Sequence, residues 1–203
     1  MIDLSESMMT IARKRLESCG LTPNMLVADA TSLPFPDASF DRYVSNMTVH
    51  YAPDADAFLC EAARIVAPGG VAGFTVWGHE ESSSAFTLLP RLKKQLDLVD
   101  DSAAPARSSY HMGEDDSALR QRVLAAGFRS CVVWHAQTVV EAACAETFAE
   151  TMIDGSYSTK QEYLGWTKEM QERFRSQVVS TATDILERGD PLTLDVCYCI
   201  AQR

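Results

Sequence analysis

Residues that could bind a ligand directly follow two predicted strands near the start of the 203-residue chain. Asp29 ends the apolar strand at 25–28, while Asn46 and Met47 follow a second predicted strand at 40–45. Ligands in α/β sheets bind at the carboxyl ends of the strands, so carboxylate and amide side chains placed there suit ligand binding. A plain turn that begins at Asp29 is the alternative interpretation.

Four histidines are candidates for proton transfer, because imidazole titrates close to neutral pH. His50 and Tyr51 come soon after the run at 40–45, and His50 could accept a proton from a substrate hydroxyl. A structural histidine at the start of a helix is the alternative. His79 follows another predicted strand and is a weaker candidate, while His111 and His135 receive no role.

The six cysteines form no C-x-x-C pair, and zinc sites need closer Cys and His spacing, so the sequence predicts no metal site. Two of them, Cys197 and Cys199, are two residues apart in a predicted strand and share one of its faces. Most of the cysteines lie in apolar surroundings. We therefore expect reduced cysteines in a cytoplasmic protein.

Charge and hydropathy exclude several classes of partner. The formal net charge is −10, with 18 basic against 28 acidic residues, so the overall field opposes polyanions. Apolar runs stay well short of the roughly 18 residues that a membrane span requires. The composition therefore predicts neither a nucleic-acid partner nor a membrane partner.

Strands and helices alternate with short connections over the first 78 residues. Ser5 can cap a helix at 5–16, and further segments are a helix at 54–66 and a strand at 71–77 that follows Pro68-Gly69-Gly70. This order is typical of an α/β fold with a doubly wound, mostly parallel sheet and helices on both faces. Beyond residue 78 we predict helices at 86–99, 117–126 and 148–186, the last with a turn near 154–155, and strands at 131–140 and 194–201.

Five segments agree in order and spacing with a known family: Ile-Asp-Leu-Ser at 2–5, the helix after it, Val-Ala-Asp-Ala at 27–30, the Pro-rich stretch at 33–41, and Val-Ala-Pro-Gly-Gly at 66–70. In these segments the chain resembles class I S-adenosylmethionine-dependent methyltransferases of the ubiquinone/menaquinone-biosynthesis type. The resemblance covers the first 78 residues. It implies a Rossmann-like sheet, S-adenosylmethionine as cofactor and a small organic molecule as methyl acceptor.

The resemblance also implies which residues contact the adenosine of the cofactor. Asp3 would accept hydrogen bonds from both ribose hydroxyls, for which a carboxylate has two suitable oxygens. Leu4 would pack on the adenine, Asp29 would bind its amino group, and the N–H of Ala30 would reach a ring nitrogen. Without the resemblance, Asp3 is a plain helix cap.

Four later residues would lie near the reacting end of the cofactor. The resemblance places Asn46 and Met47 along the methionine part, and His50 and Tyr51 facing the transferred methyl group and the substrate. An aromatic ring at Tyr51 could favour the sulfonium cation. The Ser-Asn-Met-Thr sequence at 45–48 differs from the motif of amino methyltransferases that act on nucleic acids.

The family's glycine-rich loop, which follows its first strand, has no counterpart in these 203 residues, because Asp3 is only the third residue. The resemblance therefore implies an N-terminally truncated domain that lacks the first strand, with impaired methyl transfer. Two strand edges would then lack a neighbour, which favours self-association as a homodimer. We expect one domain, 1–203, with cap insertions at about 79–116 and 141–190.

Two other functions remain open on the sequence. A non-catalytic, methyltransferase-like interaction or regulatory protein would explain the absent loop. A nicotinamide-dependent oxidoreductase also uses an acidic residue after its second strand, although the segments at 33–41 and 68–70 fit methyltransferases better.

Overall fold

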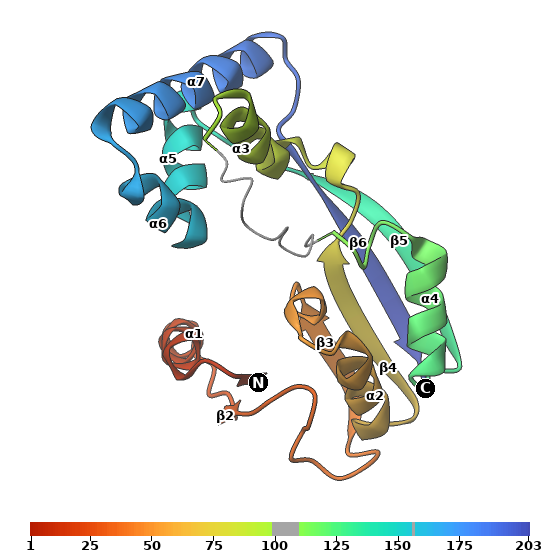
Figure 1. Ribbon diagram of the computed structural model, residues 1–203. Helices are drawn as coiled ribbons and strands as arrows, with labels where there is room; N and C mark the ends of the chain where they lie inside the picture. Colours follow the sequence, from red (N-terminus) through yellow and green to blue (C-terminus); the bar gives the residue numbers. More distant parts are fainter. Residues whose placement is uncertain (99–109, 156) are drawn as a thin grey trace. The chain divides into compact units, whose positions relative to one another are not determined.

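The computed structural model describes residues 1–98, 110–155 and 157–203 (Figure 1). The chain divides into two compact units, each with its own core. The first unit comprises Met1–Val76, His111–Trp134 and Cys197–Arg203, and the second comprises Trp77–Tyr110 and His135–Val196. Residues 99–109 and residue 156 lie outside the described residues, and so does the end of the helix predicted at 86–99.

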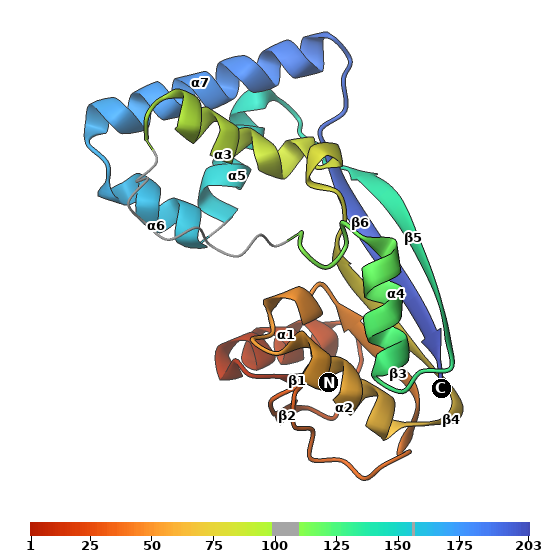
Figure 2. The same ribbon diagram turned by 45° about the vertical axis from the view of Figure 1, so that its right-hand side comes forward.

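A two-stranded parallel sheet contains the first two strands, β1 (Ile2–Asp3) and β2 (Leu26–Val27). Ile2 lies opposite Leu26, and Asp3 lies opposite Val27. The carboxyl ends of both strands therefore meet at one edge. This short sheet and α1 (Glu6–Ser18), the helix that connects its strands, are visible in Figure 2.

The larger sheet has four strands in the order β3 (Phe40–Asn46), β4 (Val66–Trp77), β6 (Thr193–Gln202) and β5 (Ser130–Val139). β3 and β4 are parallel. β6 runs antiparallel to β4, because the hydrogen bond from Gly78 N–H to Asp195 O and that from Arg203 N–H to Gly70 O lie at opposite ends of β6. The predicted α/β fold is confirmed, and in the described residues β1 and β3 belong to separate sheets.

Side-chain caps fix where the helices of the first unit begin. Ser5 accepts a hydrogen bond from the N–H of Met8, as predicted for α1, and Asp54 caps α2 (Ala55–Ile65) in the same way. Asp115 caps α4 (Asp116–Ala125). The apolar sides of α2 and α4 pack on β4 and β6, and the core includes Phe58, Leu59, Phe74, Val123, Cys197 and Cys199.

A partly exposed arginine-carboxylate network holds the Pro-rich segment at 33–41 against α2. The Arg64 guanidinium donates to the carbonyls of Leu33 and Phe35 and to the carboxylates of Asp37 and Glu61. Hydrogen bonds to these carboxylates raise the pKa of Arg64, so its charge is permanent. The network gives the segment a defined path between β2 and β3.

The Pro68-Gly69-Gly70 segment differs from the prediction. The strand predicted to begin at 71 already begins at Val66, directly after α2, and these three residues lie within β4 where its register with β3 is irregular. Gly69 has a φ of +80° and donates to Arg203 O at 2.7 Å. The segment is therefore a bulge that pairs with the end of β6 rather than a turn outside the sheet.

The second unit is largely helical. It contains α3 (Ser84–Gln95), α5 (Ala145–Gly155), α6 (Tyr157–Gly165) and α7 (Lys168–Glu187), whose core includes Leu88, Phe148, Phe174 and Val178. The helical stretch predicted at 148–186 consists of three helices: α5 continues through the predicted turn at 154–155 to Gly155, α6 begins at Tyr157, and Thr167 caps α7. None of the helices in the described ranges is long and apolar enough to cross a membrane.

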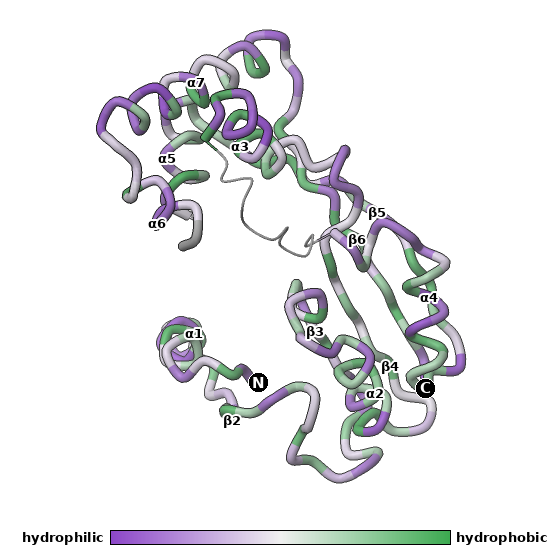
Figure 3. Tube along the Cα trace, viewed as in Figure 1, coloured by the Kyte–Doolittle hydropathy of each residue, from purple (hydrophilic) through white to green (hydrophobic). Residues whose placement is uncertain are grey.

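Apolar side chains are exposed on the segment that contains β1, α1 and β2. Met9 is the buried residue of α1, whereas Met8, Ile11, Leu26 and Val27 are exposed. Figure 3 shows hydrophobic residues interspersed with polar ones along α1. This segment therefore buries little apolar area of its own and adds little to stability.

Replacing Gly70 with alanine tests the close packing of the bulge. An alanine Cβ would lie 2.7 Å from Val66 Cγ1 and 2.8 Å from Ala67 O. Gly70→Ala should lower the free energy of unfolding by about 2 kcal/mol or more, measured by denaturant titration. The matched control is Gly155→Ala, where nothing lies within 4 Å of the new Cβ and the helical site gains about 1 kcal/mol at most. Equal stability of the two variants would contradict this description of the bulge.

Candidate functional site: strand ends of the first unit

Asp3 and Asp29 lie at the same edge of the two-stranded sheet. Asp3 ends β1, and Asp29 comes two residues after the end of β2. The two strands are parallel and the N–H of Ala28 donates to Asp3 O at 3.2 Å, so both carboxylates follow the carboxyl ends of paired strands. This is the arrangement in which α/β sheets bind the polar parts of nucleoside ligands.

Asp3, which is predicted to bind the cofactor, also accepts a hydrogen bond within its own segment. Its Oδ1 accepts the N–H of Ser5 at 2.8 Å, and Ser5 in turn caps α1. The helix cap is therefore Ser5, and Asp3 supports this cap through the N–H of Ser5. The next side chain, Leu4, is 68% exposed, and an exposed leucine beside a carboxylate offers an apolar surface to a flat ring.

Asp29 is held by Thr31 in a tight turn. Its Oδ1 accepts hydrogen bonds from the backbone N–H and the hydroxyl of Thr31, both at 2.8 Å. These bonds, the backbone one foremost, lower the pKa of the Asp29 carboxyl, so it is charged at neutral pH. Ala30 packs against the core of the first unit, which links this turn to the larger sheet.

Asn46 and Met47 are fixed at the end of β3 by a single threonine of β4. Thr75 Oγ1 donates to Asn46 Oδ1 at 2.7 Å and accepts the N–H of Met47 at 2.9 Å. Met47 has a φ of +52°, a left-handed conformation that is uncommon for methionine. Strained backbone held by a defined network is frequent at functional sites, so the binding role of Asn46 and Met47 stays a prediction.

His50 and Tyr51 lie in a short 3₁₀ helix, Val49–Tyr51, that follows β3. Their rings are 4.1 Å apart between centroids. His50 is buried, and this burial, helped by the nearby His111, lowers its pKa to about 4. At neutral pH the imidazole is thus uncharged, whereas Tyr51 is 63% exposed.

A cavity of about 490 Å³ lies between the two sheets of the first unit. It is lined from the β1–β2 side by Ile2 and Leu26 and from β3 by Tyr43 and Val44. None of the predicted site residues lines it. The cavity marks the space between β1 and β3, where the resemblance implies an absent strand.

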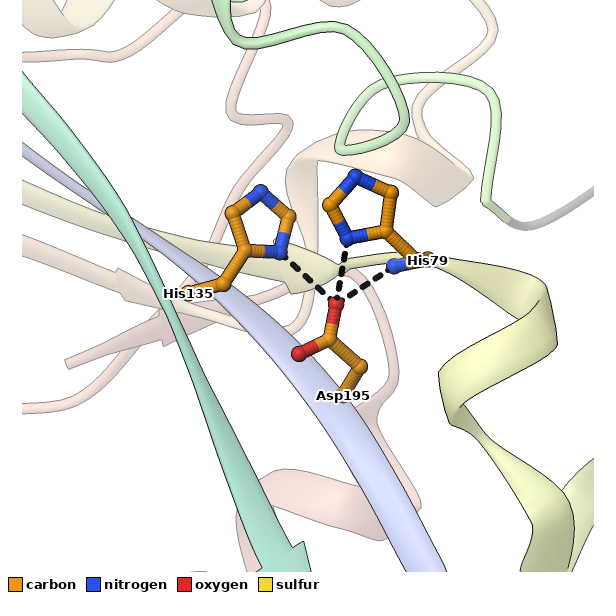
Figure 4. Close-up of side chains that lie close together, drawn as sticks. All are labelled: His79, His135 and Asp195. Carbon is orange, nitrogen blue, oxygen red and sulfur yellow. Dashed lines mark hydrogen bonds and ion pairs between the residues drawn. The ribbon is translucent and has the colours of Figure 1, made fainter.

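A second cluster of titratable residues lies in the other unit and was not predicted as a group. Nδ1 of His79 and Nδ1 of His135 both lie within hydrogen-bonding distance of the same carboxylate oxygen of Asp195 (Figure 4). Burial tends to raise the pKa of Asp195, but hydrogen bonds from His79 and His135 outweigh it and leave the pKa below its ordinary value. An aspartate on the buried face of the apolar strand at 194–201 was the available signal in the sequence.

Comparisons with known proteins support the assignment of the fold. Residues 1–74 match a family model described as a methyltransferase domain. The ubiquinone/menaquinone biosynthesis C-methyltransferase UbiE of Coxiella burnetii is 30% identical over 139 residues, which are 64% of this chain and 56% of that relative. This chain is therefore similar to methyltransferase domains over residues 1–74. It spans about half the length of the curated relatives that it matches.

Solved structures agree with the methyltransferase fold. The YcgJ protein of Bacillus subtilis superposes with a TM-score of 0.57 at 15% identity, over 100% of this chain and 80% of that one. Phosphoethanolamine N-methyltransferase 2 of Haemonchus contortus, solved in complex with S-adenosyl-L-methionine, gives 0.51 at 18% identity over 100% and 42%. At these identities the likeness shows the methyltransferase fold alone.

The protonation of His50 is testable by NMR of the imidazole Cε1–H signals. Its pKa of about 4 in the folded domain lies below the ordinary 6.5, so the unfolded chain takes up this proton first as the pH falls. Stability from this residue is present above pH 6.5 and is lost as the pH falls to about 4. His50→Gln should remove this part of the pH dependence. A His50 titration midpoint near 6.5 would contradict the burial described here.

Proposed function

We propose that this methyltransferase domain transfers a methyl group from S-adenosylmethionine to a small organic molecule. The observation that carries the proposal is that Asp3 and Asp29 both lie at the carboxyl-end edge of a two-stranded parallel sheet. This sheet lies within the segment that matches the methyltransferase family. The net charge of −10 argues against a nucleic-acid substrate.

The residues at the strand ends fit the adenosine part of the cofactor. Asp29 has a lowered pKa and is therefore a charged carboxylate, and Asp3 is a second carboxylate beside the exposed Leu4. In this proposal Asp3 binds the ribose hydroxyls and Leu4 packs on the face of the adenine. Asp29 binds the adenine amino group, and the N–H of Ala30 binds a ring nitrogen. When bound, the cofactor supplies an electrophilic methyl group that needs positioning more than activation.

The residues after β3 would position the reacting end. Asn46 and Met47, locked by Thr75, lie along the methionine part in this proposal. His50 and Tyr51 would face the methyl group and the acceptor. With its pKa lowered to about 4, His50 is a weak base at neutral pH. We therefore propose that its uncharged imidazole mainly forms a hydrogen bond with the acceptor instead of removing a proton from it.

We propose further that these 203 residues alone bind the cofactor weakly. They contain no glycine-rich loop, and a cavity takes up the space between β1 and β3. The residues at the adenosine end and those at the methionine end belong to different sheets. A ligand that contacts both ends would have to order the two sheets, at a cost in conformational entropy.

We propose that the insertions at about 79–116 and 141–190 select the methyl acceptor. A cytoplasmic location is supported by six free cysteines, three of them buried.

A homodimer is supported by apolar residues on one face of the larger sheet. Val44, Val132 and Ile200 are exposed, and Val44 is 80% exposed. Light scattering tests the dimer directly, and a monomeric mass at high concentration would contradict it.

Binding of S-adenosylhomocysteine to the chain tests the function. Two-dimensional NMR titration resolves weak binding, and Asp3→Asn should weaken it roughly tenfold or more, because a hydrogen bond to a charged group contributes about 1.5–3 kcal/mol. Asp190→Asn removes an exposed carboxylate of the other unit and should bind like the parent chain. Equal binding by all three proteins would contradict the role of Asp3.

The same titration separates the alternatives. Absence of binding at any accessible concentration would contradict the cofactor assignment and favour a non-catalytic interaction protein. Competition by a nicotinamide dinucleotide would instead favour the oxidoreductase.

A further inference from the structure

Three potential metal ligands from separate parts of the sequence meet in the second unit. His79 follows β4, His135 lies on β5 and Asp195 lies on β6 (Figure 4). Nδ1 of His79 is 3.0 Å from Asp195 Oδ2, and Nδ1 of His135 is 2.7 Å from the same oxygen. The two imidazole rings stack with centroids 4.2 Å apart, so both nitrogens face one point.

The three side chains differ in solvent exposure, which increases from Asp195 through His135 to His79. The Asp195 side chain is 3% exposed, that of His135 is 17% and that of His79 is 43%. The carboxylate thus forms the base of the cluster, and His79 lies at its open side. A ligand can reach the three donor atoms from the side of His79, while the carboxylate is shielded from water.

Backbone contacts hold the base of the cluster in place. The N–H of His79 donates to Asp195 Oδ2 at 2.6 Å, and the N–H of Gly78 donates to Asp195 O at 2.9 Å. Ser83, which is fully buried, accepts the N–H of Asp195 at 3.0 Å and donates to His79 O at 2.9 Å. Such outer contacts orient ligands in metal sites.

Gly78 has no side chain, and part of the cluster occupies the space that a side chain would fill. A Cβ at this position would lie 2.2 Å from Asp195 Oδ2 and 2.7 Å from His135 Nδ1. Its backbone needs no glycine for conformational reasons, because its φ lies outside the left-handed region. Glycine is thus required here by the close approach of two donor atoms.

We propose that His79, His135 and Asp195 bind one divalent transition-metal ion of the zinc class. Two imidazole nitrogens are borderline donors, and together with one carboxylate oxygen they suit Zn²⁺ and Co²⁺ rather than Mg²⁺ or Ca²⁺, which prefer oxygen ligands alone. The potential ligand atoms lie within 4.8 Å of one another. Bonds of about 2.0–2.1 Å in tetrahedral geometry would separate these atoms by roughly 3.4 Å. Metal binding would therefore lengthen both the His79–Asp195 distance of 3.0 Å and the His135–Asp195 distance of 2.7 Å, and the partly exposed His79 has more freedom to rotate than His135.

Three protein ligands leave one tetrahedral position for water or an oxygen donor of a small ligand. Closed structural zinc sites have four protein ligands, whereas sites with three are the open, reactive kind. The site is separate from Asp3, Asp29 and Asn46, and the proposal is independent of cofactor binding.

Titration of the chelator-treated protein with Co²⁺ tests the site, because cobalt in such a site has visible d–d absorption. We expect one ion per chain and a spectrum without thiolate-to-metal charge transfer. Zn²⁺ should displace Co²⁺ stoichiometrically. His79→Ala should weaken binding at least about 100-fold, since even loss of an outer-shell contact costs 10–100-fold.

The matched control is His111→Gln, which removes a histidine of the first unit and should leave the titration unchanged. Circular dichroism checks that each variant folds, and His79→Ala stays informative even if Asp195→Asn unfolds, because His79 is partly exposed. Absence of stoichiometric binding in the parent chain would overturn the proposal. Unchanged binding by His79→Ala, or cobalt spectra with intense thiolate bands, would overturn it equally.

Discussion

The backbone hydrogen-bonding groups of a β-strand need partners on both sides of the strand or contact with water, and this requirement governs the first unit. β3 pairs with β4 on one side, while β1 pairs with β2. Between β1 and β3 lies a cavity lined by apolar side chains instead of a strand. A two-stranded parallel sheet is marginal in stability by itself, so the segment from β1 to β2 depends on contacts outside its own ladder.

The division of the sheets would affect the proposed cofactor site directly. Asp3 and Asp29, which we propose to bind the adenosine, follow the strands of the small sheet, whereas Asn46 and Met47 lie at the end of β3 in the large one. Arg203, at the end of β6, donates to carbonyls at the end of α2 and so ties this helix to the large sheet. In the proposed function, positioning across the whole cofactor depends on how well the small sheet is held against the large one.

Local signals in the sequence predicted the elements that depend on local physics. Ser5 and Asp54 identified the starts of α1 and α2, because a short polar side chain before an apolar periodic run is a cap. The second break in the helical region, before α7, was missed, because Thr167 has the same cap chemistry but lies within a continuous periodic pattern. The bulge at Gly69 and Gly70 was placed before the strand instead of within it, because its pairing partner, Arg203, is far away in the sequence.

The candidate sites show the same limit. Asp3 and Asp29 could be placed together because consecutive parallel strands align their carboxyl ends. The group formed by His79, His135 and Asp195 could not, because it depends on the register of β5 and β6 with β4, and side-chain spacing along the chain carries no information on that register.

Residue-resolved amide hydrogen exchange across β1, β3 and β4 tests the central claim most directly, namely that β1 and β3 have no strand between them. The account predicts strong protection throughout the interior of β4, and within Phe40–Asn46 an alternation in which amides facing the cavity exchange rapidly. Amides of Ile2 to Asp3 should exchange faster still. Uniform protection of β1 and β3 at the level of β4 would contradict it, since both edges would then be paired in solution.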